Sequence, residues 1–165
     1  MRDFTAESEF DTFYRKEYAR AVCVIARVVD DLTAEDVVQE AFTKLYDRWP
    51  LDLSHARNLL YCTALYGAST ARRSALRRSL REQGFQATTS DDPVEPVERR
   101  EIRESVRQVL KRLSRSYASV LVLRHSGYSY REVGEILGIS VNHVGVLLYR
   151  AEIAFEKEYK RVSSR

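Results

Sequence analysis

The sequence predicts an all-α protein of two small helical domains joined by a flexible acidic linker, and three observations lead to this prediction. The chain has 165 residues, of which 44% are hydrophobic and 31% charged, so it is too apolar to be disordered. It contains only 6 Gly and 3 Pro, which leaves few obligatory turns. Apolar residues recur at helical spacing in two blocks, and the alternation typical of strands is absent from both.

The first block is assigned to a domain over residues 1–83. Its first helix is expected from aromatic and aliphatic residues that recur at helical spacing as far as Val29. Thr33, followed three positions later by Asp36, resembles a capping box and predicts that the second helix begins there. The polar face of that second helix carries Glu35, Asp36, Gln39 and Glu40.

A third helix is expected to be capped by Ser54, and a fourth is expected to begin after Tyr66 and Gly67. Arginines are predicted to line one face of this fourth helix: Arg72, Arg73, Arg77, Arg78 and Arg81. Between Gly67 and Gln83 the stretch holds a single acidic residue, Glu82. Such a face can neutralise phosphates and release counterions, which indicates nucleic-acid binding. The alternative is an ordinary solvated face.

Residues 84–97 separate the two blocks and are predicted to form the flexible linker. This stretch contains Asp91 and Asp92 but no basic residue, and Pro93 and Pro96 disfavour a helix. The second block is assigned to a domain over 98–165.

The sharpest local signal in the second block is a predicted helix-turn-helix. Ser129 and Glu132 form a Ser-x-x-Glu capping box at the start of a short helix, Gly138 supplies the turn, and Ser140 caps a longer helix. Four apolar residues are expected to hold the two helices at their crossing: Val133, Ile139, Val144 and Leu148. The start of the longer helix would then face a major groove. The alternative is a helix corner that binds no DNA.

Several classes of function are not expected. Cys23 and Cys62 are predicted to be buried thiols, and the three histidines are too scattered for a zinc site. We expect no cofactor, no small-molecule substrate and no enzymatic activity, because no glycine-rich phosphate loop or nucleophile motif is present. The N-terminal stretch has no apolar signal region, and no run of about 18 apolar residues occurs. A cytoplasmic protein without membrane insertion is therefore predicted.

The combination of motifs resembles the extracytoplasmic-function sigma factors, which keep only conserved regions two and four. Residues 34–42, Ala-Glu-Asp-Val-Val-Gln-Glu-Ala-Phe, resemble the segment of region two that docks on RNA polymerase. Residues 98–125 resemble the entry to region four, and 127–140 together with 149–151 resemble its helix-turn-helix. The resemblance covers nearly the whole chain, and it implies that core RNA polymerase and promoter DNA are partners, with an anti-sigma factor as a further one.

The resemblance also implies roles for individual residues. The residues implied in polymerase binding are Glu35, Asp36, Gln39 and Glu40. Those implied in binding the minus-ten element are Tyr66, Arg72, Arg73, Arg77 and Arg78. Those implied in binding the minus-thirty-five element are Arg131, Ser140, Asn142, His143, Tyr149 and Arg150.

Several positions depart from the family pattern, among them Leu59, which stands where the family has Trp. Tyr66 stands where the family has Asn. An Asn amide can hydrogen-bond a base edge in two directions, whereas Tyr66 offers a ring for stacking and a single hydroxyl. Gly145 and Leu147 stand where the family has Lys and Arg, so two phosphate contacts are lost. The apolar run 145–147 leaves two alternatives open: a sigma-like adaptor that binds a protein without reading promoters, or a stand-alone helix-turn-helix repressor, although no dimer face is evident.

Overall fold

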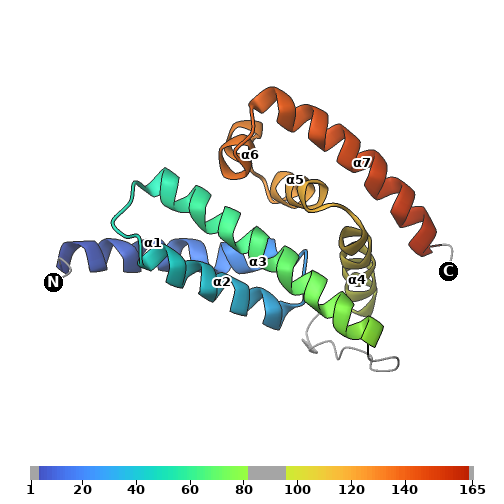
Figure 1. The fold of residues 1–165 in the computed structure, drawn as a ribbon, viewed down its shortest axis with the longest axis horizontal. Helices are drawn as coiled ribbons and strands as arrows, with labels where there is room; N and C mark the ends of the chain where they lie inside the picture. Colours follow the sequence, from blue (N-terminus) through green and yellow to red (C-terminus); the bar gives the residue numbers. More distant parts are fainter. Residues whose placement is uncertain (1–3, 82–95, 164–165) are drawn as a thin grey trace.

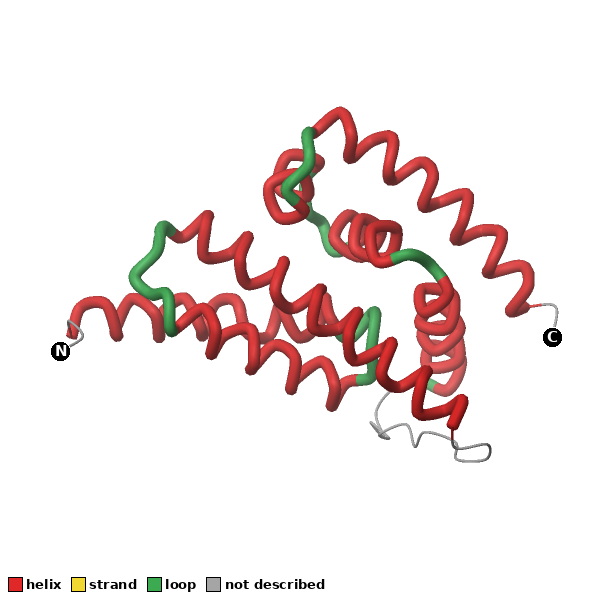
Figure 2. Tube along the Cα trace, in the orientation of Figure 1, coloured by secondary structure: helices red, strands yellow, loops and turns green. Residues whose placement is uncertain are grey.

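The computed structural model describes residues 4–81 and 96–163, and these residues form seven helices and no strand (Figures 1 and 2). The helices are α1 (Phe4–Ile25), α2 (Asp31–Tyr46), α3 (Leu53–Arg81), α4 (Val97–Arg112), α5 (Arg115–His125), α6 (Tyr130–Leu137) and α7 (Val141–Ser163). The all-α prediction is confirmed. The predicted linker lies almost entirely outside the described residues, and the assignment of domains to 1–83 and 98–165 stays a prediction.

Helices α1 to α3 form the N-terminal module, residues 4–81, in which α2 packs against both α1 and α3. The apolar face predicted for α2 is buried: Ala34, Val37, Val38, Ala41, Phe42 and Leu45. Phe13 and Trp49 close one end of this core, with ring centroids 5.7 Å apart. Burial of this stripe holds α2 in place and leaves its polar face outward.

Two helix starts in the N-terminal module differ from the prediction. The N-cap of α2 is Asp30, whose carboxylate accepts a 2.9 Å hydrogen bond from the Thr33 backbone N–H. The predicted start at Thr33 is therefore wrong by one turn. At the start of α3, Asp52 accepts a hydrogen bond from the His55 backbone N–H at 3.1 Å, so the predicted cap Ser54 lies inside the helix. A carboxylate at an N-cap also interacts favourably with the helix dipole.

The predicted third and fourth helices are one continuous helix, α3, which runs through Gly67. The prediction of a break was wrong because Gly67 serves packing rather than a turn. A Cβ atom at Gly67 would come 3.0 Å from a methyl group of Val37, so the missing side chain lets α3 approach α2 closely. Tyr66 and the arginines therefore lie on one continuous helix.

Helices α4 to α7 form the C-terminal module, residues 96–163, in which α7 packs against α4, α5 and α6. The predicted helix-turn-helix is confirmed as α6, a turn and α7, with Gly138 in the left-handed conformation at φ 67°. Of the four residues expected at the crossing, Val133, Val144 and Leu148 are buried. Ile139 is half-buried against the same core.

The two modules pack on each other, and Figure 1 shows the C-terminal module lying along one side of α3. Helix α6 packs against α3. Across this contact the rings of Tyr61 and Tyr128, both fully buried, meet edge to face at 5.2 Å. The closed arrangement buries aromatic surface from both modules, which favours it over separated modules.

Both cysteines are exposed, so the prediction of buried thiols was wrong. Cys23 lies on the outer side of α1 and Cys62 on that of α3, although apolar neighbours surround each in sequence. Within residues 4–81 and 96–163, no group of His, Cys, Asp and Glu side chains could hold a metal ion. In the same ranges no single helix is long and apolar enough to cross a membrane. Helices α6 and α7, which are bent by 94° relative to each other, reach that length and apolarity only when they are taken together.

Candidate nucleic-acid interface

The acidic residues of α2 form an exposed face. Glu35, Asp36, Gln39 and Glu40 are all exposed, as their predicted role requires. Glu40 pairs with Lys44 one turn later at 2.6 Å, and the Gln39 amide donates to the Tyr18 hydroxyl at 3.4 Å. The face remains open to a partner because both contacts are themselves at the surface.

The outer half of α3 presents an aromatic ring and guanidinium groups together. Tyr66, Arg73 and Arg77 stand at i, i+7 and i+11, so they share one side of the helix. Tyr66 is 59% exposed, and Arg73, Arg77 and Arg78 are also exposed. An exposed ring beside exposed cations is the arrangement that stacks bases and follows a phosphate backbone.

Arg72 does not join this surface, which corrects the prediction of one arginine face. Its guanidinium donates to the backbone carbonyls of Leu110 and Leu113, at 2.6 and 3.1 Å, and so satisfies the C-terminal end of α4. Desolvation, and then the charge of Arg73, lower the pKa of Arg72 from its ordinary value. It stays protonated at neutral pH nonetheless. Arg81 is also outside this description, because its side chain is not among those described.

The start of α7 is an exposed polar surface. Ser140 caps the helix by accepting from the His143 backbone N–H at 3.3 Å, and Asn142 and His143 face solvent in the first turn. About two turns further along, Tyr149 is 67% exposed and the adjacent Arg150 is also exposed. Arg131 of α6 is exposed and pairs with Glu135 at 3.1 Å. The structure therefore leaves all six residues predicted for duplex binding accessible.

The capping box of α6 fixes the helix that supports this surface. Ser129 accepts from the Glu132 backbone N–H at 3.2 Å, and the Glu132 carboxylate accepts from the Ser129 backbone N–H at 2.8 Å. These hydrogen bonds lower the pKa of Glu132, and the charges of Arg57 and Arg20 from the N-terminal module add to the effect.

An apolar stripe also runs along the outer face of α7. Val146 and Ile153 are each 51% exposed, and they share a face with Asn142 and Tyr149 at i, i+4, i+7 and i+11. Sequence reasoning noticed only the run 145–147. The helical spacing of Val146, Tyr149 and Ile153 was the signal that it missed.

Sequence reasoning also missed two buried charged residues, of which Arg107 joins the two modules and Glu17 joins α1 to α3 within the N-terminal module. Arg107 of α4 is only 8% exposed, and it donates to the Ala26 carbonyl at 2.8 Å and to the Asp31 carboxylate at 2.6 Å. Glu17 of α1 is 1% exposed and pairs with Arg57 at 3.0 Å. No pattern within one helix marks these residues, because their partners lie far away in sequence.

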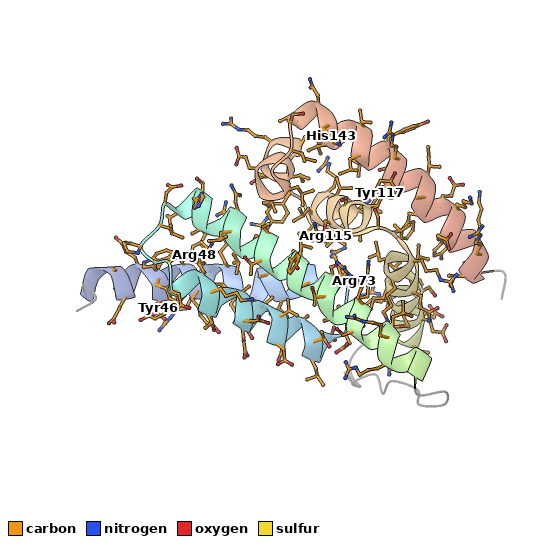
Figure 3. All side chains as sticks on the ribbon, viewed as in Figure 1. Tyr46, Arg48, Arg73, Arg115, Tyr117 and His143 are labelled. Atoms are coloured by element: carbon orange, nitrogen blue, oxygen red, sulfur yellow. The ribbon has the colours of Figure 1, made fainter. Side chains whose placement is uncertain are left out.

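Figure 3 places the labelled residues of the two surfaces. Arg73 and Arg115 lie where α3 meets the C-terminal module, and His143 lies far from them at the start of α7. The two candidate DNA surfaces are therefore separate: one borders the contact between the modules, and the other points away from it.

Comparison with known proteins accounts for both modules. Residues 103–154 match the family model for sigma-70, region 4. The chain is 30% identical over 155 residues to the RNA polymerase sigma factor YlaC of Bacillus subtilis, covering 89% of this chain and 90% of that protein. The sigma factor RpoE of Bartonella quintana, solved with the anti-sigma factor NepR, is similar in fold with a TM-score of 0.60 and 15% identity, covering 92% of this chain and 97% of that one. The chain belongs to the RNA polymerase sigma factors, and its build from regions two and four is that of the extracytoplasmic-function group.

Proposed function

We propose that this chain directs core RNA polymerase to specific promoters and so starts transcription. The observation that carries the proposal is the similarity to a sigma factor along nearly the whole chain. The exposed polar start of α7 fits duplex DNA, and the ring and cations on α3 fit a single strand. The proposal gives the chain no chemical step of its own. It places the chain in the cytoplasm, where polymerase and promoter DNA are found.

Each module has its own part in this function. The α2 face, Glu35 to Glu40, would contact the core enzyme through its exposed carboxylates. Tyr66 would stack on an unpaired base of the minus-ten element, while Arg73 and Arg77 hold the strand backbone. Asn142 and His143 would reach base edges in the minus-thirty-five major groove.

A reconstituted transcription reaction tests the proposal. Core polymerase with this chain is expected to give transcripts from a distinct set of starts in a genomic DNA library, and core enzyme alone is not. The double change Arg73→Glu and Arg77→Glu is expected to abolish open complexes, because it places repulsive charge against the strand backbone. Its binding to core polymerase should be unchanged.

The matched control is Arg15→Glu with Lys16→Glu, which reverses two exposed cations on α1, away from the proposed DNA surfaces. This control is expected to transcribe normally. Equal transcription by the α3 variant and the control would refute the minus-ten assignment. Failure of the unmodified chain to bind core polymerase would refute the proposal itself.

A second candidate function is favoured by the apolar stripe on α7. An exposed line of Val146, Tyr149 and Ile153 fits a protein partner better than a phosphate backbone. A sigma-like adaptor with such a partner would bind polymerase but give no promoter-specific transcript. We also propose an anti-sigma factor as a partner, because RpoE of similar fold was solved with one.

A further inference from the structure

We propose that two copies of this chain pair through α7, as two parallel helices packed along the apolar stripe of its outer face. The inference goes beyond the proposed function, because the pairing needs neither polymerase nor DNA. Three observations carry it: the spacing of the stripe, the residue types within it, and two charged side chains beside it that form no ion pair within the described residues.

The stripe has the spacing of a coiled-coil seam. Val146, Tyr149 and Ile153 stand at i, i+3 and i+7, which are the a, d and a positions of a heptad. Helix α7 packs on its own module through a different face, on which Val144 and Leu148 are buried. Figure 1 shows α7 along the outer edge of the C-terminal module. A second helix can therefore lie along the stripe while the chain keeps its fold.

The residue types favour two parallel helices. Val146 and Ile153 are both β-branched, and β-branched residues at the a positions favour a parallel two-stranded coiled coil. The seam is short, because Glu156 and Lys160 occupy its next two positions and pair with each other at 2.6 Å. An interface of so few layers buries little area, so we expect a weak and reversible dimer.

Two charged residues flank the stripe on opposite sides. Glu152 and Lys157 are exposed, and neither forms an ion pair within residues 4–81 and 96–163, whereas Glu158 of the same helix pairs with Arg161 at 2.8 Å. Residues five apart cannot meet on one helix, since neighbours there are three or four apart. In a parallel pair, however, the g position of one helix meets the e position of the next heptad on the other. Glu152 of each copy would therefore meet Lys157 of the other.

The same charges disfavour the antiparallel orientation. Arg150 and Lys157 both occupy e positions, on one side of the stripe. Antiparallel helices set the e side of one copy against the e side of the other, which opposes like charges. The parallel orientation instead joins opposite charges at two equivalent places.

Pairing and duplex binding would compete for one face of α7. Asn142 and Tyr149 share that face with the stripe, and the proposed function assigns both residues to the minus-thirty-five duplex. The major groove admits a single helix, so a paired α7 cannot enter it. Only this consequence of the pairing rests on the proposed function.

Sedimentation velocity on the full-length chain, without polymerase or DNA, tests the pairing. The unmodified chain is loaded at concentrations from about 10 µM to about 1 mM, the range in which weak dimers form. We expect a sedimentation coefficient that rises with concentration from that of a monomer toward that of a dimer.

The first set of variants tests the seam. Ile153→Gln removes an apolar layer and is expected to keep the chain monomeric over the same range. The matched control is Ile102→Gln, because Ile102 of α4 is 59% exposed and Ile153 is 51% exposed. The control should associate like the unmodified chain. Val146→Gln removes the other β-branched layer and should behave as Ile153→Gln does.

Charge exchange tests the parallel orientation. Glu152→Lys alone and Lys157→Glu alone each set like charges against each other, and each is expected to raise the dissociation constant of the dimer about tenfold. An equimolar mixture of these two variants restores opposite charges at both places, so it should associate as strongly as the unmodified chain. Glu98→Lys makes the same charge change at an exposed glutamate of α4 and should have no effect.

Any of three outcomes would overturn the inference. The first is an unmodified chain that stays monomeric up to about 1 mM. The second is unchanged association in both Ile153→Gln and Val146→Gln. The third is a mixture of the charge variants that associates no more strongly than either variant alone. Failure of the proposed function would appear in the transcription reaction instead, so the two failures are distinguishable.

Discussion

Helices α3 and α7 are the two long helices proposed to bind DNA, and they present their binding residues in opposite ways. The outer half of α3 is rich in cations, but Arg72 and Tyr66 are already in contact with the C-terminal module. The start of α7 is free of the other module, but its outer face carries an apolar stripe in place of cations.

The two helices therefore differ in the property that favours DNA binding, which is positive charge on α3 and accessible side chains on α7. Charge on α3 supplies long-range attraction for a strand through Arg73, Arg77 and Arg78, which are exposed, whereas Arg72 is engaged by the end of α4. On α7 the side chains are accessible, and with few phosphate contacts their binding depends on base edges and shape. Reading of the duplex is therefore expected to tolerate salt better than capture of the strand.

The largest expected effect compares two exposed tyrosines, one on each helix. In the polymerase complex, Tyr66→Ala is expected to weaken single-strand binding by about 1–3 kcal/mol, the usual contribution of stacking one base on an aromatic ring. Tyr149→Ala should leave strand binding unchanged and weaken binding to minus-thirty-five duplex. Gel-shift titrations with single-stranded and duplex probes measure both. The comparison fails if the two variants lose affinity for the same probe.

An effect of similar size, on stability, distinguishes two glycines of the helix-turn-helix. A Cβ at Gly134 would lie 2.8 Å from the Ile139 carbonyl oxygen, so Gly134→Ala is expected to destabilise the chain by about 1–3 kcal/mol. A Cβ at Gly145 would meet only the Tyr130 ring at 3.7 Å, so Gly145→Ala should stabilise α7 by up to about 1 kcal/mol. Urea unfolding measures both free energies.

The Gly145→Ala variant also tests whether DNA approaches the backbone of α7 at this position. No contact within the described residues requires glycine there, so a fall in duplex affinity in the stabilised variant would indicate that DNA approaches the backbone at this position. An unfolding free energy that falls in Gly145→Ala would contradict the packing described above.

The smallest expected effect comes from adding a positive charge to the apolar stripe on the outer face of α7. Val146→Lys places a cation on the exposed stripe, so the slope of log affinity against log salt for duplex DNA should steepen by about 0.9 if one phosphate is reached. Val146→Gln is the uncharged control. An unchanged slope in the lysine variant would mean that this face of α7 does not lie beside the phosphate backbone, which favours the protein-partner function.

Sequence patterns correctly predicted features within single helices, but they did not predict the contacts between helices. The capping box at Ser129, the turn at Gly138 and the buried face of α2 were all predicted, because each depends on neighbours within a few residues. Gly67 was misread as a break, since its reason is a methyl group of Val37 on another helix. The thiols were misread as buried because apolar neighbours in sequence do not determine which way a residue faces.

The sequence by itself determined the all-α class, the helix-turn-helix, and the acidic and basic residues that any polymerase- and DNA-binding role would use. Only the tertiary structure decided that Arg72 caps α4, that Arg115 lies beside the Tyr66 ring and that Arg107 ties the modules together. The physical reason is the separation in sequence over which each kind of interaction acts. Helical periodicity and capping act over one or two turns, whereas an arginine finds its carbonyl or carboxylate only after the chain has folded back on itself.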